Sequence, residues 1–361
     1  MLSKRVNELD VSGIRKVFSL AAKLKNPVNL SIGQPDFDVP EQIKEQAIEH
    51  IQMGHNKYTQ SAGIPELREL IQNDFKAKDI KSEDVIITSG VSGGISLAVQ
   101  ALIDPGDEVL VADPYFVMYE AIPKLYGGKI VLIDTYPDFQ IDPQKLKEAI
   151  TPKTKLLFLN SPANPTGIIM GKERLQEIAK VLEGTGILVI SDEIYDIFDY
   201  EQKHSYFASL YEKTLTLGGF SKTLGMTGWR VGYALGPKEI IDTMIKLQQY
   251  TFVCAPSFAQ YASLKAFDID QENMIGIYKG KRDFVYNSLK DKYQIIKPDG
   301  AFYFFIKHPV FNGDDLAMKA LEKNIMLIPG SVFSSKNTHF RLSFSNTMEE
   351  LERGMEGLNT I

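Results

Sequence analysis

The chain has 361 residues, more than one simple core usually accommodates, so we expect one large and one smaller domain. Its net charge of −6 arises without any basic run, which argues against a nucleic-acid partner. No apolar stretch reaches membrane-spanning length, and the N-terminus lacks the apolar core of a signal peptide, so neither a membrane protein nor a secreted one is expected.

The cysteine and histidine content points to a reducing compartment and to no metal. Cys254 is the only cysteine, so no disulfide can form within the chain, and the cytoplasm is the simplest location. We interpret Cys254 as a small buried side chain rather than a catalytic thiol. The five histidines are dispersed and show no metal-ligand spacing.

The first 80 residues predict helices joined by turns. The segment Leu30–Pro40 is rich in turn formers and contains Gly33, and Lys57–Gly63 is a polar loop that carries Tyr58. The helices are predicted over Gly13–Lys25, Glu41–Gln52 and Pro65–Ala77.

From residue 84 the pattern changes to short apolar runs that alternate with helical segments. Seven strands are predicted, at Val85–Thr88, Glu108–Ala112, Lys129–Asp134, Lys155–Asn160, Ile187–Ser191, Thr214–Gly218 and Val231–Leu235. Helices are predicted between them, at Gly94–Ile103, Pro114–Leu125, Asp142–Ile150 and Lys172–Leu182. Because the strands lack a polar face, the alternation favours an α/β fold with a mostly parallel seven-stranded sheet covered by helices on both faces.

The C-terminal part predicts a smaller α+β unit to which the N-terminal segment contributes. A long polar helix is expected over Gln271–Lys290. Short strands are expected near Gln294–Lys297, Ala301–Ile306, Ile325–Ile328 and His339–Ser343. We assign residues 46–275 to the large domain, and residues 1–45 together with 276–361 to the small one.

Ligands of such a sheet bind at the carboxyl ends of its strands, so the residues that follow each strand are the candidates. Thr88–Gly94 is a glycine turn that opens a helix and could present backbone N–H groups to a phosphate, although an ordinary turn would look the same. It matches neither a nucleotide phosphate loop nor the dinucleotide fingerprint. Asp113–Tyr119 places aromatic side chains where they could cover a flat ring, with core packing as the alternative.

Three further strand ends carry polar residues. In Asn160–Gly167, two prolines would hold the amide of Asn164 rigidly. Ser191–Tyr195 puts a carboxylate at the sheet edge, where burial requires a cation or a donor. Gly218–Arg230 contains four glycines, a lysine and an arginine, and we expect a loop between two buried strands that offers an imine-forming amine beside an anion clamp. The alternative for this segment is a surface turn with two solvated cations.

Taken together, these strand ends resemble the pyridoxal-phosphate enzymes of fold type I, specifically the class I/II aminotransferases. The resemblance extends from Gly33 to Arg341. Its most specific motifs are Asn164–Gly167, Asp192–Tyr195, and Ser221-Lys222 followed by Gly228–Gly232.

The resemblance implies roles for the residues around the cofactor ring. Lys222 is expected to form the Schiff base with pyridoxal 5'-phosphate and to move the substrate proton. Asp192 is expected to pair with the pyridinium nitrogen. Asn164 and Tyr195 would bond the phenolic oxygen of the ring, and Phe116 would stack on its face.

The resemblance also assigns the phosphate and the substrate. Val91, Ser92 and Arg230 would hold the phosphate. Tyr58 would reach the phosphate of a partner subunit, which implies a homodimer. Arg341 would clamp the substrate α-carboxylate with help from the Gly33 backbone, and Asn164 would also bind the substrate.

One departure concerns the phosphate site. The family often has a serine three residues before the lysine, and this chain has Gly219 there. The missing hydroxyl could be replaced by Ser221, by Ser92 or by water.

The implied reaction is transfer of an amino group from an L-amino acid to a 2-oxo acid with ping-pong kinetics. The sequence does not specify which amino acid is the substrate. A pocket for an apolar or aromatic amino acid could be lined by Phe37, Tyr303 and Phe333, or these could be core residues.

The same scaffold could also serve a carbon–sulfur β-lyase. A cofactor-sensing domain of a transcription regulator is a further alternative, which the acidic charge and the early position of Gly33 disfavour.

Overall fold

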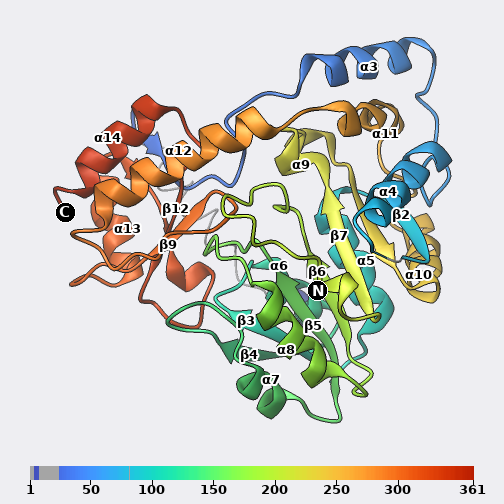
Figure 1. Ribbon diagram of the computed structural model, residues 1–361, viewed down its shortest axis with the longest axis horizontal. Coiled ribbons are helices and arrows are strands. Elements are labelled where there is room, and N and C mark those ends of the chain that lie inside the picture. The colour runs from blue at the N-terminus through green and yellow to red at the C-terminus, as the bar shows by residue number, and fades with distance from the viewer. Residues whose placement is uncertain (1–3, 8–23, 81) are drawn as a thin grey trace.

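The computed structural model describes residues 4–7, 24–80 and 82–361, and its central feature is a seven-stranded sheet (Figure 1). The strands lie in the order β2-β8-β7-β6-β5-β3-β4. Their bounds are β2 (Asp84–Thr88), β3 (Glu108–Asp113), β4 (Lys129–Asp134), β5 (Thr154–Asn160), β6 (Leu188–Asp192), β7 (Thr214–Gly219) and β8 (Gly232–Gly236). All neighbours pair in parallel except β8, which is antiparallel to β2 and β7. The chain passes from β7 to β8 without a crossover helix along the sheet, so β8 must run the opposite way. The predicted mostly parallel sheet is confirmed.

Both faces of the sheet are buried, and β5 illustrates why its strands lack a polar face. Leu156 and Phe158 belong to the core beneath one set of helices, whereas Leu157 and Leu159 belong to the core on the other side. Side chains alternate between the faces of a strand, so a strand buried on both sides is apolar throughout. The first set of helices is α5 (Gly90–Leu102), α6 (Met118–Leu125) and α10 (Lys238–Gln249), and the second includes α7 (Pro143–Ala149) and α8 (Lys172–Leu182).

The smaller unit joins the N-terminal segment to the C-terminal part of the chain. Strand β1 (Val28–Asn29) pairs in parallel with β10 (Ile325–Met326). A three-stranded sheet has the order β11-β12-β9, with β9 (Tyr303–Ile306), β11 (Ile328–Pro329) and β12 (Phe340–Ser343). Its helices are α12 (Glu272–Leu289), α13 (Gly313–Glu322) and α14 (Met348–Leu358). In Figure 1, α12 runs along the top of the molecule from the side of the large sheet to α14. The domain boundaries at residues 45 and 275 stay a prediction.

The remaining elements are short or peripheral. Helix α3 packs against α11, and in Figure 1 it lies away from the central sheet. These elements are α1 (Lys4–Asn7), α3 (Glu41–Gln52), α4 (Pro65–Ala77), α9 (Phe220–Thr223), α11 (Ser257–Ala262), η1 (Phe207–Ser209), η2 (Thr227–Trp229), η3 (Ser263–Asp268) and η4 (Gly330–Val332). Within the described part of the chain, every helix is too short or too polar to cross a membrane.

Most predicted elements are confirmed to within a few residues, with three differences. The predicted strand Gln294–Lys297 is wrong, because only an isolated bridge joins Gln294 to Lys307. The predicted strand Ile325–Ile328 is divided at Leu327 between two sheets. The predicted helix Pro114–Leu125 begins only at Met118, and the N–H of Tyr115, before it, donates to the carbonyl of Phe333 at 2.7 Å. The predicted helix Gly13–Lys25 lies largely outside the described residues.

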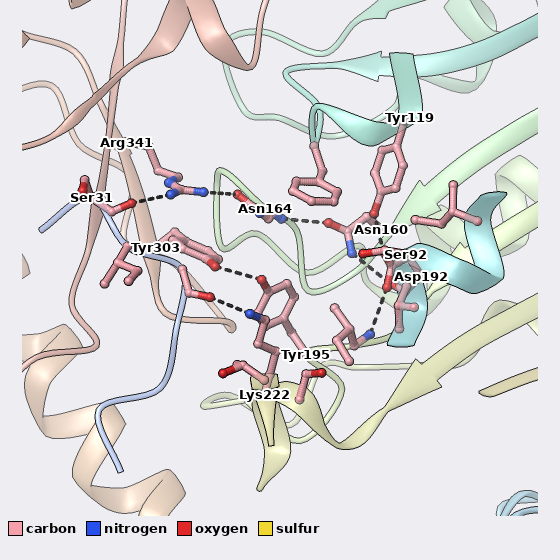
Figure 2. Close-up of a pocket in the computed structure, with 18 of the residues that line it drawn as sticks. Ser31, Ser92, Tyr119, Asn160, Asn164, Asp192, Tyr195, Lys222, Tyr303 and Arg341 are labelled. Atoms are coloured by element: carbon pink, nitrogen blue, oxygen red, sulfur yellow. Dashed lines mark hydrogen bonds between the residues drawn. The ribbon is translucent and has the colours of Figure 1, made fainter. Parts of the chain in front are cut away.

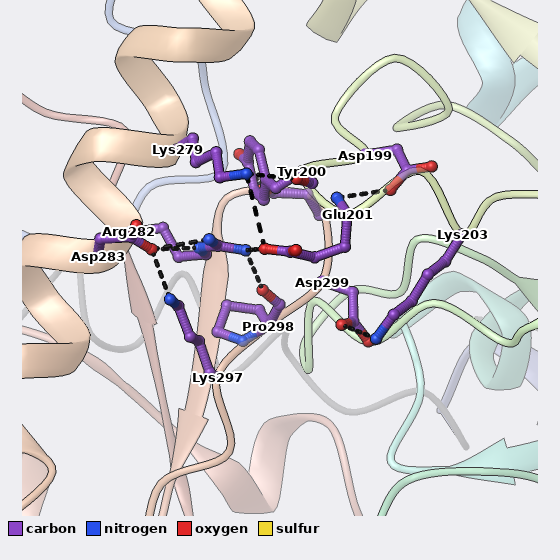
Figure 3. A network of polar contacts seen from close by, with 11 residues as sticks. Asp199, Tyr200, Glu201, Lys203, Lys279, Arg282, Asp283, Lys297, Pro298 and Asp299 are labelled. Atoms are coloured by element: carbon purple, nitrogen blue, oxygen red, sulfur yellow. Dashed lines mark hydrogen bonds and ion pairs between the residues drawn. The ribbon is translucent and has the colours of Figure 1, made fainter.

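A buried arginine connects the smaller unit to the segment that follows β6 (Figure 3). Arg282 on α12 is 1% exposed, and its guanidinium donates to Glu201 at 2.8 Å, to Asp283 at 2.8 Å and to the carbonyl of Pro298 at 3.1 Å. It also lies over the ring of Tyr200, 5.0 Å from its centre. These contacts fix the segment that leads from the end of β6 against the smaller unit.

We expect Arg282→Ala to lower the free energy of unfolding by about 3 kcal/mol, as when one partner of a buried pair is removed. The two carboxylates are more than a third exposed and can bind water, which keeps the loss near the low end of that range. Lys203→Ala is the matched control, because Lys203 is half exposed where it pairs with Asp299, and it should cost less than about 1 kcal/mol. Urea unfolding measures both, and equal losses would contradict this account.

Candidate active site

A cavity of about 290 Å³ lies between the sheet edge and the smaller unit (Figure 2). It is at the carboxyl ends of the parallel strands, where the sequence predicted a site. It collects side chains from β6, α5, α9, the segment after β1, and the strands β9 and β12. Its lining includes Ser31, Ile32, Gly33, Val91, Ser92, Ile95, Phe116, Tyr119, Asn160, Asn164, Asp192, Ile194, Tyr195, Ser221, Lys222, Thr227, Arg230, Tyr303 and Arg341.

The carboxylate in the cavity is Asp192, the last residue of β6, and it is 2% exposed. It accepts hydrogen bonds from the hydroxyl of Tyr119 at 2.6 Å and from the N–H of Ile194 at 3.2 Å. Burial raises the pKa of Asp192 to about 6, because it penalises the charged carboxylate more than these two donors favour it. Asp192 is therefore mostly ionised at neutral pH, although it is buried.

We expect Tyr119→Phe to raise the pKa of Asp192 by about 1. The substitution removes a hydrogen bond that stabilises the charged carboxylate, while burial continues to destabilise that charge. Carbon-13 NMR titration of labelled aspartate in the cofactor-free protein measures this, with Asp192→Asn to assign the signal. Tyr115→Phe is the control, since the hydroxyl of Tyr115 donates to Glu120 at 2.8 Å and not to Asp192. An unchanged titration in Tyr119→Phe would show that the contact does not control the charge.

Two asparagines connect the ends of β5 and β6 to the arginine of the smaller unit. The amide of Asn160 donates to the backbone carbonyl of Asp192 at 2.8 Å, and its oxygen accepts from the N–H of Asn164 at 2.8 Å. The side-chain oxygen of Asn164 in turn accepts from Arg341 at 2.9 Å. This contact orients the amide, and the side-chain nitrogen of Asn164 has no hydrogen-bond partner among the described residues, so it is available to a ligand.

Arg341 lies in β12 with 2% of its surface exposed. Besides Asn164, it donates to the carbonyl of Ser31 at 2.7 Å, while its buried Nε has no partner among the described residues. The guanidinium contacts two rings, 4.6 Å from the centre of Tyr303 and 4.6 Å from that of Phe333. A planar cation held this way, with an N–H unsatisfied, suits a carboxylate ligand.

Lys222 lies in the single helical turn α9, whereas the sequence predicted a loop. Its Nζ donates to the carbonyl of Gly33 at 2.5 Å. Burial, together with the charges of Arg341 and Arg230, lowers the pKa of Lys222 to about 8, against the opposite effect of Asp192. A larger neutral fraction of this amine is present at neutral pH than for an exposed lysine.

Arg230 lies against the start of α5 and forms a cationic cradle there. Its guanidinium donates to the carbonyls of Thr227 at 3.0 Å and Ser89 at 3.4 Å. A Cβ at Gly90, whose φ is +66°, would come within 2.6 Å of the Arg230 Nη2 atom, so glycine is needed there. Val91 and Ser92 follow in the first turn of α5, where free N–H groups favour an anion.

The structure gives a packing reason for Gly219, where a serine was expected. A Cβ at Gly219 would be 3.0 Å from the Cα of Gly232 and 3.2 Å from the carbonyl of Val231. Strand β8 thus approaches β7 too closely for a side chain without a shift of the backbone. Ser221 and Ser92, the two proposed replacements, both line the cavity.

Tyr195 and Phe116 also reach the cavity, as predicted. The hydroxyl oxygens of Tyr195 and Tyr303 are 2.8 Å apart. Of the aromatics proposed as pocket lining, Tyr303 is in the cavity, whereas Phe333 packs on Arg341. Phe37 lies at a separate depression of about 350 Å³ beside α12.

Tyr58 is the one predicted site residue that the chain does not bring to the cavity. It is 83% exposed, on a surface depression with Lys57 and Tyr261.

Four polar residues of the cavity were not predicted from the sequence: Tyr119, Asn160, Ser31 and Thr227. Tyr119 and Asn160 lie within the segments Asp113–Tyr119 and Asn160–Gly167, and Ser31 is close to Gly33 in sequence. No sequence pattern pointed to Thr227. Among the described residues, no group of three or more His, Cys, Asp or Glu side chains could hold a metal ion.

Known proteins are similar to this chain in sequence and fold over nearly their whole length. The family described as aminotransferase class I and II matches residues 25–358. The probable aspartate aminotransferase of Methanocaldococcus jannaschii is 39% identical, and the alignment covers 98% of each chain. The aromatic-amino-acid aminotransferase 2 of Thermococcus litoralis is 35% identical, over 100% of this chain and 98% of its own length. The solved aspartate aminotransferase of Thermotoga maritima superposes with a TM-score of 0.95 at 33% identity, over 99% of each chain. The chain therefore belongs to the class I and II aminotransferases, and it is a transaminase.

Proposed function

We propose that this aminotransferase uses pyridoxal 5'-phosphate to move the amino group of an L-amino acid to a 2-oxo acid in two half-reactions, with Lys222 as the amine that carries the proton. The supporting observation is that one cavity places Lys222 among a buried carboxylate, Asp192, and two guanidiniums, Arg341 and Arg230. We also propose a cytoplasmic location, for which the single cysteine is the support.

The residues of the cavity fit pyridoxal phosphate. Its volume of about 290 Å³ is near the lower end of the roughly 300–1,000 Å³ usual for ligand pockets. The ionised Asp192 suits a protonated ring nitrogen, and the free nitrogen of Asn164 suits the phenolic oxygen. The cradle at the start of α5 with Arg230 suits the phosphate, and Phe116 offers an aromatic face to the ring.

When bound, the cofactor supplies the electron sink for the charge left on the substrate carbon. Asp192 contributes a negative charge that is lost as the pH falls through its pKa of about 6. Lys222, with its pKa lowered to about 8, can accept a proton at Nζ near neutral pH and return it. Arg341 would hold the substrate α-carboxylate through its unsatisfied Nε and the adjacent N–H groups.

The substrate class can be tested directly. Relatives are named for aspartate and for aromatic amino acids, so L-aspartate and L-phenylalanine are the informative donors, each with 2-oxoglutarate as acceptor. We expect parallel lines in double-reciprocal plots, because the donor's 2-oxo acid leaves before the acceptor binds. Converging lines, or release of pyruvate and ammonia from cystathionine without any acceptor, would contradict transamination and favour the β-lyase.

We further propose a homodimer in which Tyr58 completes the partner subunit's site. Tyr58 is highly exposed and lies outside its own chain's cavity, although the resemblance assigns it to a phosphate. Nearby, α3 and the residue after it expose Ile48, Ile51 and Met53, which are 55%, 44% and 61% exposed. Exposed apolar side chains grouped on one helix are typical of an interface.

Hybrid dimers test the sharing of Tyr58. Lys222→Ala and Tyr58→Ala are each prepared, mixed under conditions that exchange subunits, and assayed. If Tyr58 acts across the interface, one site of the hybrid has both defects and the other has neither, so activity reappears. If Tyr58 acts within its own chain, every site keeps one defect and mixing restores nothing.

A further inference from the structure

We propose that Tyr303 is a positioning residue that directs the hydroxyl hydrogen of Tyr195 into the cavity and supports the guanidinium of Arg341 with its ring. The proposal rests on the proposed function. Tyr303 is the first residue of β9, is 1% exposed and lies between the two other side chains (Figure 2).

The hydroxyl contact has two possible directions, and the surroundings select one. Each phenol has a single hydrogen, so if Tyr195 donated across the 2.8 Å contact it would have none left for a ligand. Neither hydroxyl has another partner among the described residues. The Arg341 cation is 4.6 Å from the ring centre of Tyr303, and a nearby cation makes a phenol the better donor. The proposal assigns the donor role in this contact to Tyr303, whose ring lies against that cation, so that the hydrogen of Tyr195 remains for an acceptor in the cavity.

The ring of Tyr303 acts on the arginine. In the paired strands Tyr303 is opposite Ser343 and Phe305 is opposite Arg341, so Tyr303 and Arg341 are diagonal neighbours on one face. The guanidinium carbon lies 4.6 Å from the ring centre of Tyr303 and 4.6 Å from that of Phe333. These aromatic contacts restrict the movement of the Arg341 guanidinium, which lines the cavity.

Tyr303 also packs against the segment that bonds Lys222. A Cβ at Gly33 would be 2.5 Å from the hydroxyl oxygen of Tyr303, so these two residues are in close contact. The carbonyl of Gly33 is the acceptor of Lys222. One side chain thus touches the parts of the site assigned to the cofactor and to the substrate.

Two substitutions separate the roles of hydroxyl and ring. Tyr303→Phe keeps the ring, so we expect kcat to fall about three- to tenfold, the usual effect of one lost hydrogen bond, with KM for the amino acid nearly unchanged. Tyr303→Leu also removes the ring, so KM should rise in addition. Tyr293→Phe is the control: it is another buried tyrosine, its hydroxyl donates to the carbonyl of Leu358 at 2.7 Å, and it should change neither constant.

A double-mutant cycle with a spectroscopic readout tests whether Tyr303 acts through Tyr195. The pH at which the visible absorbance of the bound cofactor changes should shift in Tyr303→Phe in the same direction as in Tyr195→Phe, by a smaller amount. The double variant should equal Tyr195→Phe alone, because the second hydroxyl has nothing left to orient. Additive shifts, or no shift in Tyr303→Phe, would overturn the proposal. Because the titration needs no turnover, it remains readable if the wild-type protein fails to transaminate, an outcome that would count against the proposed function instead.

Discussion

Replacing Lys222 with alanine is expected to reduce turnover by at least about 10⁴-fold, the upper end of what a positioned acid–base group contributes. The reason is positional: Lys222 is the cavity's only amine among the described residues, and its pKa is lowered to about 8 by burial and by the charges of Arg341 and Arg230. Neither guanidinium in the cavity could take over the proton transfer, because both stay protonated. Stopped-flow mixing of the cofactor-loaded variant with an amino acid donor measures the loss.

Lys238→Ala serves as the control for this substitution, because Lys238 is a surface residue on α10 whose amine pairs with Asp242. It should retain wild-type turnover. Normal turnover in Lys222→Ala would remove the basis for the proposed chemistry.

Arg341→Ala is expected to raise KM for the amino acid donor roughly 30- to 5,000-fold, the equivalent of the about 2–5 kcal/mol lost when one partner of a buried charge pair is removed. The carboxylate of the substrate would lose its cation, and the carbonyl of Ser31 and the oxygen of Asn164 would lose their donor. Steady-state kinetics with the donor varied measure this effect.

The affinity for the cofactor phosphate is the internal control for Arg341→Ala, since the phosphate is assigned to Arg230, whose partners Thr227 and Ser89 are not those of Arg341. Arg174→Ala is the surface control, because Arg174 pairs with Glu177 on the exposed side of α8. An unchanged KM in Arg341→Ala would move the carboxylate site elsewhere.

The sheet and its chemistry could be predicted because they are local in sequence. Strands buried on both faces read as uninterrupted apolar runs, and the residue that ends each strand is at the ligand-binding edge. Asp192 ends β6 and Asn164 follows shortly after the end of β5, so both were candidates from their positions, whereas their roles came from the resemblance. The role of Arg341 came from the resemblance, since nothing in the short pattern around it indicates a ligand.

The contacts between distant segments could not be predicted. Tyr119 and Asp192 are 73 positions apart, and their hydrogen bond depends on how α6 packs on the sheet. The need for glycine at position 219 depends on the strand register, which pairs Gly219 of β7 with Gly232 of β8. Both facts follow from the pairing of elements, which a single sequence does not specify.

The most direct test of the account is a single half-reaction. Cofactor-loaded protein is mixed with one equivalent of L-aspartate or L-phenylalanine without any 2-oxo acid, and the visible absorbance and the released product are followed together. The account predicts that the absorbance of the aldehyde form is lost, that the amine form appears, and that one 2-oxo acid is released per site. Release of ammonia, or an aldehyde form that persists with every L-amino acid tried, would contradict it.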